Sequence, residues 1–338
     1  MATLATESAA DRLDLRLDGH RRELTGYCYR MLGSPFDAED AVQETMVRAW
    51  RGMAGFDGRS SLRTWLYRIA TNVCVDLARG RARRALPMDL GGPCAPVESA
   101  VGEPTPAVEW IEPAPDPAVL PAEADPAELA VARESVRLAF VAALQHLPAR
   151  QRAVLVLRDV LRFSAAEVAE QLDASVTSVN SALQRARATM AARAAEAGPP
   201  ATLGAAEAQL LERYVEAFER YDVDTLVALL HADAIQNMPP FRLWLRGAAD
   251  IGRFLRGPGR ECRGSRLVPL AANGVPAFAH YRRDPAGGYR AFSIGLVEPV
   301  DGLIARLNHF VQPALFPLFG LPERLERWPE TGRPALAG

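Results

Sequence analysis

Apolar residues recur at helical spacing through the first quarter of this chain. Between residues 62 and 77 they fall at intervals of three or four and share one face of a predicted helix: Leu62, Leu66, Ile69, Val73 and Leu77. The serines directly before Leu62 are typical of a helix start. A helix is also predicted from Asp37, where acidic residues suit the positive end of the helix dipole. Residues 11–86 are therefore expected to form an all-helical segment.

A second helical pattern occupies residues 131–198. Ser164 and Glu167 have the spacing of a capping box at a helix start. A three-residue break follows that helix, and the next helix is expected to turn apolar side chains inward: Val176, Val179 and Leu183. Helix, short turn and helix in this order predict a helix-turn-helix.

The spacing of apolar residues changes from helical to alternating within residues 199–338. Helices are expected first, over 207–220, 222–231 and 248–255. Turn signals such as Asn273-Gly then separate predicted strands at 266–271, 275–282, 289–298 and 303–311. This order predicts an α+β domain with a mostly antiparallel sheet.

The charge is distributed unevenly along the 338 residues, although the formal net charge is only −2. Residues 59–84 hold seven arginines and one acid, and residues 133–198 hold nine arginines and six acids. Residues 85–132 hold nine acids and no base, together with many prolines. We interpret residues 87–130 as an acidic, proline-rich extended linker between two basic segments, an arrangement typical of nucleic-acid binders.

Composition excludes several classes of protein. An apolar fraction of 49% is enough for packed cores, and no 18-residue stretch without charges is present, so no membrane span is expected. The N-terminus lacks the apolar core of a secretory signal, and the four cysteines lack metal-binding spacing. We expect a cytoplasmic protein without a metal or cofactor. Every basic side chain apart from histidine is arginine, a bias that we attribute mainly to the genome.

The helix from residue 62 leaves polar side chains outside its apolar face. Arginine there is suited to phosphate, and Asn or Thr to bases, although such a face is equally compatible with a solvated surface. The run from Asp37 to Arg84 (DAEDAVQETMVRAW through VDLARGRARR) resembles region 2 of extracytoplasmic-function (group IV) sigma factors. The resemblance implies core RNA polymerase binding through Asp37, Glu39, Asp40 and Glu44.

The same resemblance implies melting and reading of the −10 promoter element. The residues expected to do so are Phe56, Arg63, Trp65, Arg68, Thr71, Asn72, Arg79, Arg81, Arg83 and Arg84. Unstacked bases need aromatic faces and a positive track, which this set supplies. Trp65 has a second interpretation, as a core residue of an amphipathic helix.

The helix-turn-helix resembles sigma region 4, which reads the −35 element. Its candidate DNA-binding residues are Thr177, Ser178, Asn180, Ser181, Gln184, Arg185 and Arg187. Residues 199–338 resemble a SnoaL-like cone. Such domains usually enclose a pocket, and the candidate lining residues here are Asp233, Asn237, Met238, Trp244, His280, Tyr281 and His309.

The resulting prediction is a multidomain protein with two all-α sigma units and a C-terminal SnoaL-like α+β cone. It is expected to be a non-enzymatic sigma factor that directs promoter-specific initiation, with polymerase core and promoter DNA as partners. The C-terminal domain is expected to modulate activity, with a small-molecule ligand as a candidate. Two rivals stay open: a helix-turn-helix regulator acting without polymerase, and an enzyme whose site lies in the cone, where a His near a carboxylate would serve as base.

Overall fold

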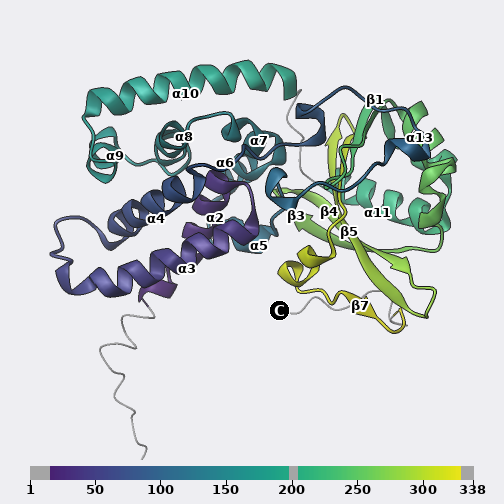
Figure 1. Ribbon diagram of the computed structural model, residues 1–338, viewed down its shortest axis with the longest axis horizontal. Helices are drawn as coiled ribbons and strands as arrows, with labels where there is room; N and C mark the ends of the chain where they lie inside the picture. The colour runs from purple at the N-terminus through teal and green to yellow at the C-terminus, as the bar shows by residue number, and fades with distance from the viewer. Residues whose placement is uncertain (1–15, 198–204, 329–338) are drawn as a thin grey trace, which may run out of the picture. The chain divides into compact units, whose positions relative to one another are not determined.

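The chain folds into helical and sheet-containing parts, described by a computed structural model over residues 16–197 and 205–328 (Figure 1). Contacts divide it into two units. The first unit combines residues up to Arg81 with Pro117–Glu196, and the second combines Ala82–Asp116 with the chain from Ala197. The expected fold class, two helical sigma parts and a C-terminal α+β part, is confirmed. The predicted boundaries at residues 11 and 199 lie outside the described residues.

The first unit is helical throughout. Its elements are α2 (Arg21–Leu32), α3 (Pro35–Gly52), the 3-10 turn η1 (Met53–Gly55), α4 (Leu62–Ala78), α5 (Asp116–Val119), α6 (Pro126–Val136), α7 (Leu138–Gln145), α8 (Ala149–Leu155), the π-helical turn η5 (Val156–Val160), α9 (Ala165–Gln171) and α10 (Val176–Ala197). Ser34 caps α3, with Pro35 in its first turn, and Ser61 caps α4 by accepting a hydrogen bond from the Thr64 amide. The helices expected around residues 37 and 62 are therefore present.

The helix-turn-helix forms as its local sequence predicts. The Ser164 hydroxyl accepts from the Glu167 amide, and the Glu167 carboxylate accepts from the Ser164 amide, which confirms the capping box. Asp173 adopts a φ of 48° in the turn before α10. Val179 and Leu183 are buried as expected. Val176 is 44% exposed, so the prediction that it faces inward is wrong; it is the first residue of its helix, where few neighbours cover it.

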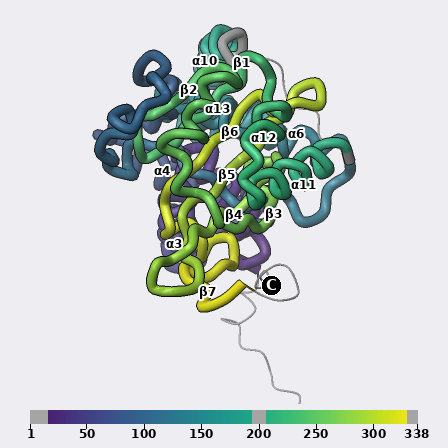
Figure 2. The backbone as a smooth tube through the Cα atoms, turned by 90° about the vertical axis from the view of Figure 1, so that its right-hand side faces the viewer, coloured from purple at the N-terminus to yellow at the C-terminus, as the bar shows by residue number. Residues whose placement is uncertain are grey.

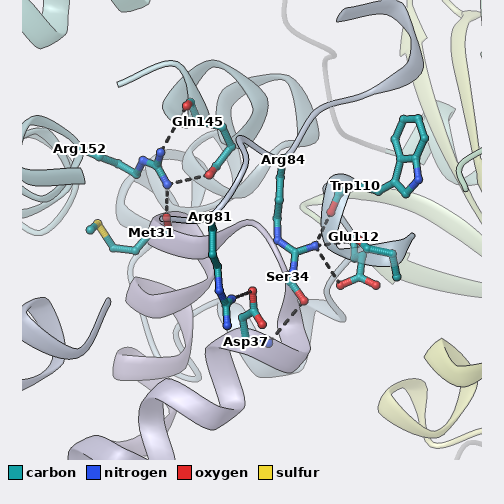
Figure 3. A network of polar contacts seen from close by, with 10 residues as sticks. Met31, Ser34, Asp37, Arg81, Arg84, Trp110, Glu112, Gln145 and Arg152 are labelled. Carbon is teal, nitrogen blue, oxygen red and sulfur yellow. Dashed lines mark hydrogen bonds and ion pairs between the residues drawn. The ribbon is translucent and has the colours of Figure 1, made fainter. Parts of the chain in front are cut away.

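Two buried arginines join α2 to the helices that follow residue 126. Arg30 donates to the Ser135 hydroxyl at 2.7 and 3.1 Å. Arg152 donates to the carbonyl of Met31 and to Gln145 Oε1, the latter at 2.6 Å, as Figure 3 shows. Burial lowers the pKa of each guanidinium to about 10. Arg30 joins α2 to α6, and Arg152 donates to carbonyls at the ends of helices, so both stabilise the packing between the two halves of the unit.

The second unit contains one mixed sheet with helices against it. Its elements are η2 (Pro87–Asp89), η3 (Glu98–Ala100), η4 (Ala107–Glu109), α11 (Ala205–Arg220), α12 (Val223–Ala228), β1 (Leu230–Asn237), β2 (Trp244–Arg246), α13 (Ala248–Arg256), η6 (Pro258–Cys262), β3 (Arg266–Ala272), β4 (Val275–Arg283), β5 (Tyr289–Val300), β6 (Leu303–Phe310), η7 (Pro313–Phe319) and β7 (Arg324–Leu325). The strand order is β2-β1-β6-β5-β4-β3, with β7 paired to β5. Only the β1–β6 pair is parallel among the described pairings.

The four strands expected from the sequence correspond to β3, β4, β5 and β6, with ends shifted by at most two residues. The helix expected over 222–231 ends earlier than predicted, at Ala228, and Leu230 already begins β1. β1 pairs with β6, some seventy residues later, so a local pattern could not reveal it. β2 and β7 have two or three residues each, too few for a detectable alternation.

The core of the second unit lies between the sheet and α11, α12 and α13 (Figure 2). Phe278 packs directly over Gly295, where a Cβ atom would lie 2.2 Å from its ring, so only glycine fits beneath it. The opposite face of the sheet contacts η7, in which Phe316 meets Tyr281 edge-on at 5.0 Å between ring centroids. Both faces of the sheet are therefore covered.

The proline-rich segment is bound to the second unit along much of its length. The Cys94 amide donates to the Trp244 carbonyl at 2.8 Å, and the Thr105 amide donates to the Pro240 carbonyl at 2.9 Å. Ala114 and Asn273 exchange two hydrogen bonds at 2.9 and 3.1 Å. The expected extended conformation is interrupted by three 3-10 turns, of which η2 begins at a proline. Residues 82–116 are thus a docked part of this unit.

Candidate polymerase and nucleic-acid interfaces

The outward face of α3 is acidic with an apolar end. Asp40 and Glu44 are exposed, and the Glu39 side chain is 47% exposed. One and two turns further on, Val47 and Trp50 are 41% and 58% exposed. Helical spacing places all five on one broad face. Val47 and Trp50 were not among the predicted site residues, although their position out of phase with the buried stripe of α3 was a detectable signal.

Asp37 lies at the edge of this face, one turn before Asp40, but its side chain is largely covered. Its carboxylate accepts from Arg81 at 2.7 Å, and its side chain is only 16% exposed (Figure 3). A residue predicted to bind polymerase and one predicted to bind DNA therefore form an ion pair with each other. Arg81 keeps 48% of its side chain exposed.

An exposed ladder runs the length of α4. Its members recur every three or four residues: Trp65, Arg68, Asn72, Asp76 and Arg79. Phe56 lies beside the first of them, with its ring 5.1 Å from that of Trp65 in a tilted pair. Trp65 is half-buried, so it packs against Phe56 and still presents part of its surface to solvent. Two aromatic rings, two arginines and an asparagine thus share one side of the helix with Asp76, which pairs with Arg79 at 3.6 Å.

Two other −10 candidates lie outside this ladder. Thr71 is fully buried, and its hydroxyl bonds the Tyr67 carbonyl and the Tyr27 hydroxyl, each at 2.7 Å. Arg63 donates to Glu23 at 2.8 Å and lies over the rings of Tyr67 and Phe163. Contacts of this kind fasten α4 to α2 and to the helix-turn-helix.

Arg83 and Arg84 belong to the second unit. Arg83 is exposed. Arg84 is buried: it donates to the Trp110 carbonyl at 2.6 Å and pairs with Glu112 at 3.7 Å (Figure 3). A buried, paired guanidinium is not available to phosphate. The placement of Arg84 in this structure therefore differs from the predicted DNA contact. Spacing alone could not separate it from its neighbours, because the residues that cover it come from 26 positions later.

All seven −35 candidates are exposed on α10: Thr177, Ser178, Asn180, Ser181, Gln184, Arg185 and Arg187. They surround the buried Val179 and Leu183 on the solvent side of the helix. Arg187 makes two hydrogen bonds to Asp159, at 2.7 and 2.9 Å. After the exposed Val176, the N-terminal half of α10 therefore presents polar side chains followed by arginine.

The C-terminal candidates do not converge on one pocket. His280 and His309 lie on the same face of the sheet as the helices, in edge-on contact with Phe218 and Phe278 respectively. Because neighbouring side chains in a strand alternate, Tyr281 takes the other face, against Phe316.

The remaining candidates are distributed around the sheet. Asn237 donates to Asn308, and Asn308 donates to Glu298, in a buried chain of polar groups at 2.6 and 2.9 Å. Asp233 is exposed, and the Trp244 indole donates to the Gly91 carbonyl at 2.9 Å. Met238 packs against the core together with residues of the docked segment. Of the seven, the two histidines share the helix-covered face of the sheet, each against a different phenylalanine.

Burial makes both histidines weak bases. Desolvation lowers the pKa of His280 well below its ordinary value, with the charge of His309 as a second cause, and lowers the pKa of His309 to about 4. Within the described residues, neither is hydrogen-bonded to a carboxylate. Over the same residues, no helix has the length and apolarity needed to cross a bilayer, and no cluster of three potential metal ligands is present.

Three family matches follow the same order along the chain. Sigma-70 region 2 matches residues 17–84, Sigma-70 region 4 matches residues 137–190, and a SnoaL-like domain matches residues 211–307. The ECF RNA polymerase sigma factor SigG of Mycobacterium tuberculosis is 48% identical over 311 residues, which cover 90% of this chain and 83% of that protein. The chain belongs to the ECF RNA polymerase sigma factors.

A second relative of this sigma factor is matched over nearly its whole length. SigJ of Mycobacterium tuberculosis is 28% identical over 93% of this chain and 95% of that protein. Its crystal structure superimposes with a TM-score of 0.59 over 92% of this chain, at 23% identity, which supports the fold. The prediction of an ECF sigma factor with a C-terminal SnoaL-like domain is confirmed. The site residues stay predictions.

Proposed function

We propose that this sigma factor binds core polymerase through the outward face of α3 and reads promoter DNA through α4 and α10. The observation that carries the proposal is the solvent exposure of these three surfaces within one helical unit. The α3 face combines carboxylates with Val47 and Trp50, a mixture suited to a protein partner. The other two surfaces combine arginine with short polar side chains, which suits nucleic acid.

The ladder on α4 has the chemistry needed for a melted −10 element. A base that has left the duplex loses its stacking partners, and an aromatic ring replaces them. Phe56 and Trp65 supply two rings, 5.1 Å apart. Arg68 and Arg79 supply positive charge along the same side, and Asn72 supplies both a donor and an acceptor for a base edge.

The N-terminal half of α10 is suited to a duplex major groove. Recognition helices contact base edges with residues of their first turns, and Thr177, Ser178 and Asn180 occupy those positions. Arg185 lies one to two turns later, where it is placed to neutralise a phosphate. The capping box on α9 orients this pair of helices.

We also propose that the C-terminal domain modulates activity through the docked segment, without catalysis. Residues 82–116 connect α4 to the rest of the chain and are hydrogen-bonded to the sheet domain. A change in that domain therefore alters the restraint on the segment between the two promoter-reading parts. The weak basicity of the histidine pair and its lack of a described carboxylate partner argue against an acid–base enzyme. A small-molecule ligand of this domain stays a prediction.

Reconstituted transcription tests the function directly. Purified core polymerase plus this protein is expected to form a stable complex and to initiate at promoters recovered from cells. A helix-turn-helix regulator would bind those promoters without retaining core polymerase. Absence of both a complex and initiation would overturn the proposal.

Asp40→Arg is expected to weaken core binding by about tenfold or more, because it reverses a charge at the centre of the α3 face. Asp40 is exposed, so the melting temperature should change little. Binding of labelled protein to core polymerase measures the effect. Glu216→Arg is the matched control, since it makes the same charge change on an exposed residue of α11. Equal affinity of Asp40→Arg and wild type would remove α3 from the interface.

A further inference from the structure

The first unit contains a cavity of about 570 Å³ between helices from its two halves. α2 and α4 form one side, and α6, the segment before it and η5 form the other. Apolar residues line much of it: Val119, Leu120, Val131, Val160 and Leu161. Four arginines and three glutamates line the rest: Arg22, Arg30, Arg63, Arg162, Glu23, Glu123 and Glu128. The volume lies in the range of small-molecule sites.

Arg30 contributes a buried positive charge to this cavity. It is 4% exposed and donates to neutral oxygens, those of Ser135, Gly26 and Ala132. No carboxylate among the described residues pairs with it. A buried charge without a counter-ion is unfavourable, and an anion brought to the cavity would relieve that cost.

The other arginines leave the interior of the cavity positive. Arg22 donates to the Leu120 carbonyl at 2.5 Å, and Arg162 is exposed at the rim without a described carboxylate partner. Glu23 is already engaged, since it accepts from Arg63 and Tyr67 at 2.8 and 3.2 Å. Glu123 and Glu128 are exposed, where water screens them. The four arginines of the lining outnumber its three glutamates, and the buried Arg30 has no carboxylate partner among the described residues.

We propose that this cavity binds a small organic anion, with one carboxylate or phosphate group and an apolar body. Guanidinium groups bind both kinds of anion with paired hydrogen bonds. The anionic head lies toward Arg30 and Arg162, and the body contacts Val119, Leu120 and Val160. The ligand touches α2 and α4 on one side and α6 and η5 on the other, so it bridges the two halves of the unit.

The regulatory consequence rests on the proposed function. α4 contacts both α8 and α9, which holds the two promoter-reading surfaces together. The −10 and −35 elements are named for positions ~25 base pairs apart, or ~85 Å of duplex. Reading both at once therefore requires the halves to separate. A ligand that bridges them stabilises the closed arrangement and opposes initiation.

Calorimetric titration of the full-length protein tests the site without polymerase. The probes are benzoate, phenyl phosphate and the neutral analogue benzamide. We expect at least one anion to bind about tenfold or more tightly than benzamide, since a charge-assisted pair replaces a neutral one. The tighter of the two anions identifies the head group. If neither anion binds better than benzamide, the proposal is overturned.

Three variants with similar side-chain sizes localise the binding. Arg162→Gln is expected to weaken the anion about fivefold, and Glu128→Gln to tighten it about twofold, as expected for exposed charges. Arg133→Gln is the control, because it makes the same change on α6 outside the cavity lining. Equal weakening by Arg133→Gln and Arg162→Gln would place the binding elsewhere and overturn the site.

Transcription in the presence of the tighter probe separates the site from its consequence. We expect reduced initiation with wild type and a smaller reduction with Arg162→Gln. Localised binding without an effect on initiation would overturn the regulatory consequence alone and leave the site intact. A protein that binds the probe but never initiates would overturn the proposed function instead.

Discussion

Neighbouring residues of α4 show how differently two polar side chains of one helix are used. Thr71 and Asn72 both looked like DNA contacts in the sequence, but Thr71 is fully buried and bonded to Tyr27, whereas Asn72 is exposed. Because an α-helix turns by about 100° per residue, the first of these adjacent residues faces the core and the second faces solvent. Loss of either side chain therefore has a different physical consequence.

Thr71→Val is expected to lower the free energy of unfolding by about 1 kcal/mol, because it leaves the Tyr27 hydroxyl without its partner. Asn72→Ala is expected to leave stability unchanged and to weaken binding to single-stranded −10 DNA. Denaturant unfolding and fluorescence anisotropy measure the two effects. If Thr71→Val weakened DNA binding at unchanged stability, its placement in the core would be contradicted.

The buried histidines make the second unit sensitive to acid. A His whose folded pKa lies below the unfolded value of about 6.5 is neutral in the fold and takes up a proton on unfolding. The contribution of such a histidine to the free energy of unfolding is complete above the unfolded-state pKa. It is lost as the pH falls from about 6.5 toward the pKa of the folded state.

For His309, whose pKa is lowered to about 4, the free energy of unfolding is expected to be about 1 kcal/mol lower at pH 5.5 than at pH 7.5. His309→Gln should reduce this pH dependence. Urea unfolding at the two pH values measures it. His231→Gln, at a partly exposed position of β1, is the control and should behave as wild type does. Identical pH dependence in His309→Gln and wild type would contradict the mechanism.

At the scale of elements, local capping determines where some helices begin, whereas other elements form only through contacts with distant residues. α3, α4 and α9 begin at serine caps; the starts of α4 and α9 were readable from the sequence, and α3 begins two residues before the predicted Asp37. β1 depends on a parallel partner far along the chain, and the docked segment depends on hydrogen bonds to residues more than 130 positions later. Local sequence propensity therefore predicts the capped helices but not β1 or the docked segment.

Ser164→Ala is expected to lower the free energy of unfolding by about 1 kcal/mol, because the Glu167 amide loses its acceptor and the reciprocal bond loses its geometry. Since α9 orients α10, binding to −35 duplex should also weaken. Ser164→Asp restores an acceptor and should recover most of the stability. Equal stability of Ser164→Ala and wild type would show that the cap contributes little.

For the whole molecule, the net charge of −2 is the sum of basic and acidic segments whose charges largely cancel. The basic segments lie in the parts that match Sigma-70 regions 2 and 4, and the acidic segment between them is held largely by the sheet domain. Removal of that domain deprives residues 82–116 of hydrogen-bond partners such as Trp244 and Asn273. The connection between α4 and α6 should then become less restrained.

Deletion of residues 199–338 is therefore expected to change the amount of transcript while DNA binding persists. Trp244→Phe, which removes the indole bond to Gly91, should give a smaller change in the same direction. Run-off transcription and promoter binding measure the two outputs. Equal transcript from the truncated and full-length proteins would contradict modulation by this domain.

The sequence by itself determined the local features of this protein: the capped helices, the helix-turn-helix, four strands and the family. Each depends on residues within one or two turns of one another, so their signal survives in a linear pattern. Only the tertiary structure decided which arginines face solvent. Arg68 and Arg185 are exposed, whereas Arg30, Arg84 and Arg152 are buried against carbonyls contributed by distant segments. A guanidinium fits either environment, and the neighbours that choose between them are brought together only by folding.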